Sequence, residues 1–69
     1  MFVKLTNCSE GFRGQPLYIN INQIASIYEY SSEPGGSLTT CIYGGQTGLV
    51  WNVEEGLLEV LKKIKEAQR

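Results

Sequence analysis

The side chains of this chain that could carry chemistry are two cysteines and a small group of glutamates near the C-terminus. The thiols are Cys8 and Cys41, the glutamates are Glu54, Glu55 and Glu59, and the chain has no histidine and no aspartate. A nucleophilic cysteine needs a neighbouring base, and general acid–base catalysis most often relies on histidine. Because these partners are missing, we predict that the protein is not an enzyme and has no catalytic residue, cofactor site or metal site.

The cysteines have a simpler interpretation as small, half-apolar positions in the fold. The N-terminal residues contain no apolar segment of secretory length, and no stretch approaches the roughly 18 apolar residues of a membrane-spanning helix. We therefore expect a cytoplasmic chain without membrane insertion, whose thiols stay reduced. A disulfide between Cys8 and Cys41 remains open, because only their geometry decides it.

A glycine-rich stretch at residues 44–48, Gly-Gly-Gln-Thr-Gly, loosely resembles a phosphate-binding loop. Such loops contain a lysine after the glycines and lead into a helix, whose first N–H groups hold the phosphate. Here no lysine follows, and the next segment has the pattern of a strand. We therefore interpret these glycines as a hairpin turn.

Charge is distributed unevenly along the 69 residues. The net charge is 6 − 7 = −1, and residues 34–53 contain no charged side chain, whereas residues 54–69 are rich in both signs. One explanation for the uncharged centre is a sheet with a polar, solvent-facing surface of Ser, Thr, Asn and Gln. We favour the other, in which a second subunit covers a face or an edge of the sheet, so we expect a homo-oligomer.

Four tyrosines in or near this uncharged region are the candidate contact residues for a subunit or partner: Tyr18, Tyr28, Tyr30 and Tyr43. Tyrosine is enriched in protein interfaces. Tyrosines on a small sheet can also stack single-stranded bases, but such sites normally include a basic groove. Because the centre of the chain has no such groove, we do not expect nucleic-acid binding, and we keep it as the alternative function.

The alternation of apolar and polar residues predicts a mainly β chain. The expected strands cover residues 2–7, 16–21, 25–30, 38–43 and 46–51, and the expected helix covers residues 53–67. Gly44 and Gly45 suit a two-residue hairpin turn, which would place Tyr43 opposite Gln46 and Leu38 opposite Trp51. We predict a single α+β domain over residues 1–69, with about five antiparallel strands in a small curved or barrel-like sheet and one C-terminal helix.

The C-terminal helix has the clearest local signals. Asn52 is a suitable N-cap, and Glu55 three residues later completes an arrangement like a capping box. Glutamates near the start and lysines near the end match the helix dipole, which explains the glutamates without catalysis. The apolar residues at helical spacing are Val53, Leu57, Val60, Leu61 and Ile64.

Taken together, these segments resemble the small flagellar and swarming-motility protein family (FlbD-like, with the SwrD-type proteins). The resemblance is carried by Lys4-Leu5-Thr6-Asn7, by Leu17-Tyr18-Ile19-Asn20 with Ile24 and Ile27, and by Val53, Glu55, Glu59, Val60 and Ile64. It implies a small cytoplasmic protein linked to flagellar motor output or swarming, with no catalytic residues. A longer loop at residues 31–37 and the glycine turn depart from the family pattern, and similar short chains also occur in phage-like settings.

From residues and resemblance together we expect a non-enzymatic interaction module. It would self-associate and bind an unidentified protein partner, in a motility context. The alternatives are a small β domain that binds single-stranded nucleic acid and a phage-type accessory or structural protein.

Overall fold

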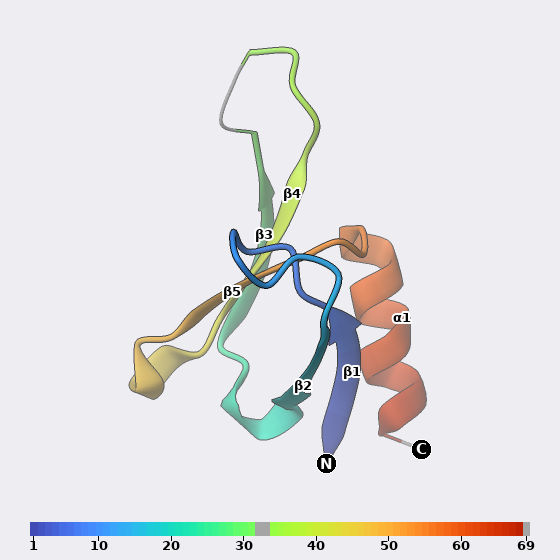
Figure 1. Cartoon of the computed structure of the whole chain (residues 1–69). Helices are drawn as coiled ribbons and strands as arrows, with labels where there is room; N and C mark the ends of the chain where they lie inside the picture. Colours follow the sequence, from blue (N-terminus) through green and yellow to red (C-terminus); the bar gives the residue numbers. More distant parts are fainter. Residues whose placement is uncertain (32–33, 69) are drawn as a thin grey trace.

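Five short strands and one C-terminal helix make up the protein in a computed structural model, which describes residues 1–31 and 34–68 (Figure 1). The elements are β1 (Phe2–Thr6), β2 (Pro16–Asn20), the 3₁₀ turn η1 (Ile21–Gln23), β3 (Ser26–Tyr30), β4 (Thr39–Tyr43), the 3₁₀ turn η2 (Gly45–Thr47), β5 (Val50–Val53) and α1 (Leu57–Ala67). The strands form two antiparallel sheets, β1-β2 and β3-β4-β5. The predicted class, mainly β with one C-terminal helix, is confirmed. The predicted loop at residues 31–37 includes Ser32 and Glu33, which lie outside the described residues.

The β1-β2 sheet follows the predicted alternation. Val3 and Leu5 of β1 and Ile19 of β2 are buried, and the register places Val3 opposite Ile19 and Leu5 opposite Leu17. Pro16 occupies the first position of β2, which suits a residue with no N–H to donate to a ladder. This sheet therefore presents its apolar face to the core.

The hairpin between β4 and β5 differs from the prediction in its turn and its register. Tyr43 pairs with Val50 and Ile42 with Trp51, whereas Gln46 and Thr47 were expected opposite them, and Leu38 lies outside β4. The predicted strand at residues 46–51 is correspondingly wrong at both ends, because β5 covers Val50–Val53.

The side chain of Thr47 explains the longer turn. Its Oγ1 donates to the carbonyl of Gly44 over 3.1 Å and accepts the N–H of Leu49 over 3.1 Å. Gly48 then adopts a left-handed conformation with φ of 69°, which favours glycine. A turn closed by these bonds replaces the predicted two-residue turn at Gly44 and Gly45.

Helix α1 begins at Leu57, four residues later than predicted. Its N-cap is Gly56, which makes no side-chain capping bond, so the predicted capping by Asn52 and Glu55 is wrong. Val53 instead pairs with Thr40 at the end of β5, where it is buried in the core. Burial of Val53 and pairing along β5 outweigh a local cap, which is typically worth only about 1 kcal/mol.

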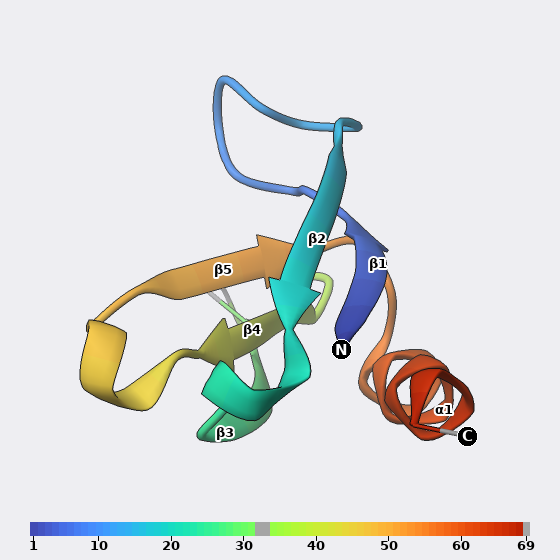
Figure 2. The same ribbon diagram turned by 90° about the horizontal axis from the view of Figure 1, so that it is seen from below.

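The buried stripe of α1 is also narrower than predicted. Val60 is fully buried and Ile64 packs partly buried against the core, but Leu61 is exposed. The core cluster brings together residues from both sheets and the helix: Val3, Leu5, Ile19, Ile42, Val53 and Val60. In Figure 2, β1 and α1 lie together on one side of the β3-β4-β5 sheet, so this side faces the core.

The two sheets meet where β1 ends and β5 ends. Asn7 forms an isolated bridge with Val53, Cys8 donates its N–H to the carbonyl of Asn52 over 2.8 Å, and Glu54 donates its N–H to the carbonyl of Thr6 over 2.9 Å. The strands nevertheless remain two sheets that are not closed on each other, so the predicted barrel-like closure is not confirmed.

Candidate interaction surface

Three of the four candidate tyrosines lie on one face of the β3-β4-β5 sheet. Tyr28 and Tyr30 come from β3, and Tyr43 comes from β4. Register places Tyr28 opposite Cys41 and Tyr43 opposite Ser26. Because side chains of directly paired residues share a face, and alternate residues of a strand share a face, all three rings point to the side opposite Ile27 and Ile42.

Val50 of β5 extends this face, because it pairs with Tyr43. We call Tyr28, Tyr30, Tyr43 and Val50 the tyrosine face. The exposed fractions of these side chains are 47% for Tyr28, 39% for Tyr30, 39% for Tyr43 and 51% for Val50. The opposite face of the same sheet packs on the core through Ile42 and the partly buried Ile27 and Trp51.

No charged side chain belongs to the strand positions of this outer face. They are Ser26, Tyr28, Tyr30, Thr39, Cys41, Tyr43, Val50 and Asn52. The uncharged residues 34–53 supply β4 and β5 of this sheet, and the positions that β3 adds to the same face are also uncharged.

Tyr18, the fourth candidate, lies elsewhere. It is on β2 in the other sheet, opposite Lys4, and its side chain is 60% exposed. The structure therefore separates Tyr18 from the other three tyrosines, and a surface built from all four is not present within one sheet.

A buried thiol holds one ring of the tyrosine face. Cys41 is only 2% exposed, and its Sγ donates a hydrogen bond to the phenol oxygen of Tyr28 over 3.2 Å. The side-chain hydrogen bond with Cys41 raises the pKa of the Tyr28 phenol above its ordinary value, because a thiolate at Cys41 accepts the phenol O–H and its negative charge disfavours the phenolate. The Tyr28 and Tyr30 rings lie with centroids 6.4 Å apart and planes tilted by 45°.

These contacts reduce the freedom of the Tyr28 ring. Sequence reasoning missed the Cys41–Tyr28 bond, because the bond depends on the long-range pairing of β3 with β4. Cys8 and Cys41 are both free thiols, so the disulfide that the sequence left open is not formed.

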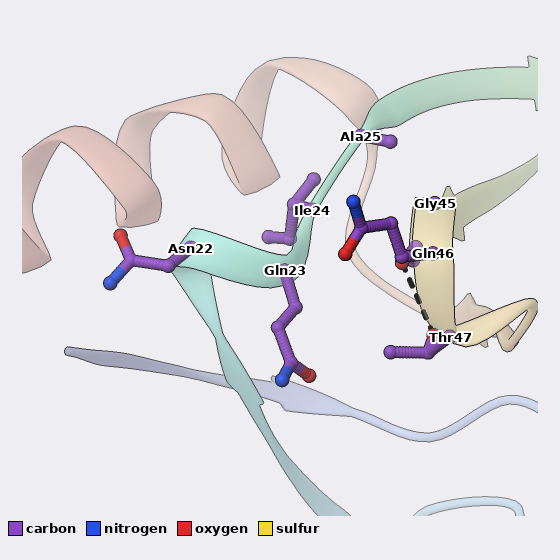
Figure 3. A pocket seen from close by; sticks show the side chains of 8 residues that line it. Asn22, Gln23, Ile24, Ala25, Gly45, Gln46 and Thr47 are labelled. Atoms are coloured by element: carbon purple, nitrogen blue, oxygen red, sulfur yellow. Dashed lines mark hydrogen bonds between the residues drawn. The ribbon is translucent and has the colours of Figure 1, made fainter.

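A shallow cavity of about 280 Å³ lies between the two 3₁₀ turns (Figure 3). In Figure 3 the side chain of Gln46 reaches from η2 toward Ile24, and Gln23 lies across from it on the η1 side. The cavity is lined by Asn22, Gln23, Ile24, Ala25, Gly44, Gly45, Gln46 and Thr47, none of which is charged. Strand β5 begins three residues after the end of η2, so these glycines do not lead into an α-helix as phosphate-binding glycines do.

A second cavity, of about 430 Å³, lies beside β1 and the segment before α1. It is lined by Lys4, Leu5, Thr6, Gly14, Pro16, Glu55 and Lys63. Both carboxylate oxygens of Glu55 are engaged by Thr6, one by the N–H and the other by Oγ1, each over 2.9 Å. Glu55 therefore has a structural role, because it accepts the outward N–H of Thr6 in β1. The sequence predicted that Glu55 would cap the helix instead.

Comparison with protein-family models, with curated proteins and with solved structures finds no match to this chain. The resemblance to the flagellar and swarming-motility family therefore stays a prediction. Within the described residues, no helix is long and apolar enough to cross a membrane.

Proposed function

We propose that this protein is a non-enzymatic interaction module that self-associates and binds a protein partner through the tyrosine face. The observation that carries the proposal is the placement of three half-exposed tyrosines and Val50 on one uncharged sheet face. Exposed apolar patches of this kind in a small domain are typical of contact surfaces. Burial of tyrosines at the centre of an interface commonly dominates its affinity.

The composition of the face favours a protein over a nucleic acid. Stacking sites for single-stranded nucleic acids combine aromatic rings with lysines or arginines that follow the backbone. Strands β3, β4 and β5 contain neither residue type, and their one charged side chain, Glu29, is acidic. A protein surface can cover tyrosines without such charges.

The cellular context belongs to the proposal as well. The resemblance to the FlbD-like and SwrD-type proteins supports a cytoplasmic role in flagellar motor output or swarming. Deletion of the gene in its host should then reduce swarm expansion while growth is unchanged. Neighbouring genes of phage structure, together with normal swarming, would favour the phage-type accessory role instead.

Two tyrosine variants test the contact surface. The double variant Tyr30→Ser and Tyr43→Ser should shift the chain toward the monomer in light scattering, because it removes two of the three rings and leaves the Cys41–Tyr28 bond intact. Tyr18→Ser is the control, since it removes an exposed ring from the other sheet. Thermal unfolding should show that both variants fold.

Unchanged mass of the double variant, or equal loss in the Tyr18→Ser control, would show that the tyrosine face is not the contact surface. A titration with labelled single-stranded RNA and DNA tests the alternative function. Tight, salt-sensitive binding there would favour the nucleic-acid alternative.

A further inference from the structure

The hydrogen bonds of the β3-β4-β5 sheet show which backbone groups of β3 are unpaired. Gly44 donates its N–H to the carbonyl of Leu49 over 2.8 Å. The backbone N–H and C=O groups of the even-numbered residues of β4 therefore point toward β5. Backbone groups alternate in direction along an antiparallel strand, so the N–H and C=O groups of Thr39, Cys41 and Tyr43 point toward β3. The N–H of Ala25, which reaches the carbonyl of Tyr43 over 2.8 Å, agrees with this direction.

It follows that Ser26, Tyr28 and Tyr30 bond inward to β4, while the N–H and C=O groups of Ile27 and Glu29 point away from it. β3 ends the order of its sheet, and within residues 1–31 and 34–68 no strand pairs with its outer side. α1 faces β3 from the core side, where Val60 and Ile64 pack in the cluster that Ile27 joins.

On β1 and β2, part of the outer edge is satisfied by local bonds or blocked by proline. The outer side of β1 is satisfied at Thr6 by Glu54 and Glu55. On β2, the N–H of Ile21 points to Met1, so alternation places Pro16, which has no N–H, on the outer side. β3 thus has an open edge directly beside the tyrosine face.

We propose that the β3 edge pairs with β3 of a second copy of this chain, antiparallel and centred on Tyr28. In this register Tyr28 lies opposite the same residue of the second copy, and Ile27 lies opposite its Glu29. The N–H and C=O groups of Ile27 and Glu29 in each copy then bond to those of the other. This inference rests on the proposed self-association and specifies its geometry.

Two features of β3 favour this register over the two adjacent ones, which are centred on Glu29 and on Ile27. A pair centred on Glu29 would place two like charges opposite each other, which is destabilising. A pair centred on Ile27 would engage Ala25, where Ala25 and Ser26 both oppose Tyr43 as in a β-bulge. The register centred on Tyr28 avoids the charge pair and lies clear of the bulge.

Pairing in this way also joins the two tyrosine faces. Side chains of directly opposite residues share a face, so the Tyr28 and Tyr30 rings of both copies would lie on one side of a six-stranded sheet. The dimer would then present one wide uncharged surface to its protein partner, rather than two separate small ones.

The backbone of Glu29 provides the test, because a proline there removes an outward N–H but no bond to β4. Glu29→Pro should weaken the dimer by about tenfold or more in sedimentation velocity, since it removes a hydrogen bond from each copy. Glu29→Ala, which keeps the N–H, is the matched control and should leave the dimer within about threefold of the wild type.

Amide hydrogen exchange on the wild-type chain tests the same geometry without a substitution. The N–H groups of Ile27 and Glu29 should exchange more slowly as the concentration rises and the dimer forms. If they exchange at the same fast rate in the dimer, or if Glu29→Ala and Glu29→Pro weaken it equally, edge pairing is wrong. Dissociation by Tyr30→Ser and Tyr43→Ser alone would then still support the proposed function, whereas a wild-type monomer at every concentration would contradict self-association itself.

Discussion

At the residue scale, the hydrogen bond from Cys41 to Tyr28 joins a buried side chain to a half-exposed one on the same face of the sheet. A thiol is a weak donor, yet here it is almost completely buried and lies beneath a half-exposed ring. The bond fixes the phenol group at the centre of the tyrosine face. When Cys41 is a thiolate, the phenol O–H donates to the sulfur instead, which raises the pKa of the Tyr28 phenol.

The raised pKa of Tyr28 makes a testable change in stability at high pH. The folded state binds the phenol proton more tightly than the unfolded chain, whose phenol has a pKa of about 10. The stabilisation is therefore complete below this pH and is lost as the pH rises through the higher pKa of the folded state. Urea unfolding between neutral pH and pH about 11 should show this loss in the wild type, and a smaller one in Tyr28→Phe.

The variant Cys41→Ala tests whether the Cys41 thiol is the cause of the raised Tyr28 pKa. It should return the Tyr28 phenol toward its ordinary pKa in an NMR titration of the ring carbons. An unchanged titration in Cys41→Ala would show that the thiol does not raise the pKa.

Sequence alone predicted the kind of residue at this surface but not its grouping. Tyrosines in an uncharged region were recognisable as contact candidates, and all four are exposed. Their grouping depends on strand pairing: Tyr43 joins Tyr28 and Tyr30 because β3 pairs with β4, whereas Tyr18 belongs to a strand that pairs with β1. Such long-range pairing leaves no local signal at any one tyrosine.

At the element scale, the hairpin and the helix show which sequence signals could be trusted. The β4–β5 register is displaced from the prediction by four residues, because the turn at η2 is longer than expected. An even displacement leaves every side chain on its predicted face, since the period of a strand is two. Ile42 and Trp51 therefore share one face and Tyr43 lies on the other, as the predicted register also implies, although the predicted partners were wrong.

The start of α1 could not be predicted, because the local capping pattern of Asn52 and Glu55 is overridden by contacts with residues that are distant in the chain. Asn52 and Glu55 have the spacing of a cap, but Val53 is buried between the sheets and Glu55 bonds to Thr6. Thr6 is 49 positions away in the chain, so no local pattern indicates this bond.

Glu55 therefore joins two elements, and its removal should lower the free energy of unfolding. Glu55→Ala leaves the N–H and the hydroxyl of Thr6 without their acceptor, at a cost of about 1–3 kcal/mol. Glu54→Ala is the control, because Glu54 bonds to Thr6 through its backbone N–H and keeps that bond. Urea unfolding of both variants measures the difference, and equal stabilities would show that the Glu55 carboxylate does not hold β1 to the segment before α1.

At the scale of the whole molecule, the division between charged and uncharged regions in the sequence corresponds to a division in space. Charged residues gather on α1, while one face of the three-stranded sheet has no charge and carries exposed tyrosines. A chain of 69 residues buries a smaller share of its surface than a larger domain does, so the proposed association would add to the stability that its small core supplies. Self-association through the tyrosine face and the β3 edge accounts for both observations.

The most direct test of this account is the mass of the wild-type chain in solution. Sedimentation equilibrium across the micromolar range should give a mass that rises with concentration from 7.7 kDa toward a dimer, because association follows mass action. A mass that stays at 7.7 kDa over the whole range would contradict the central claim, since neither the tyrosine face nor the β3 edge would then join two copies of the chain.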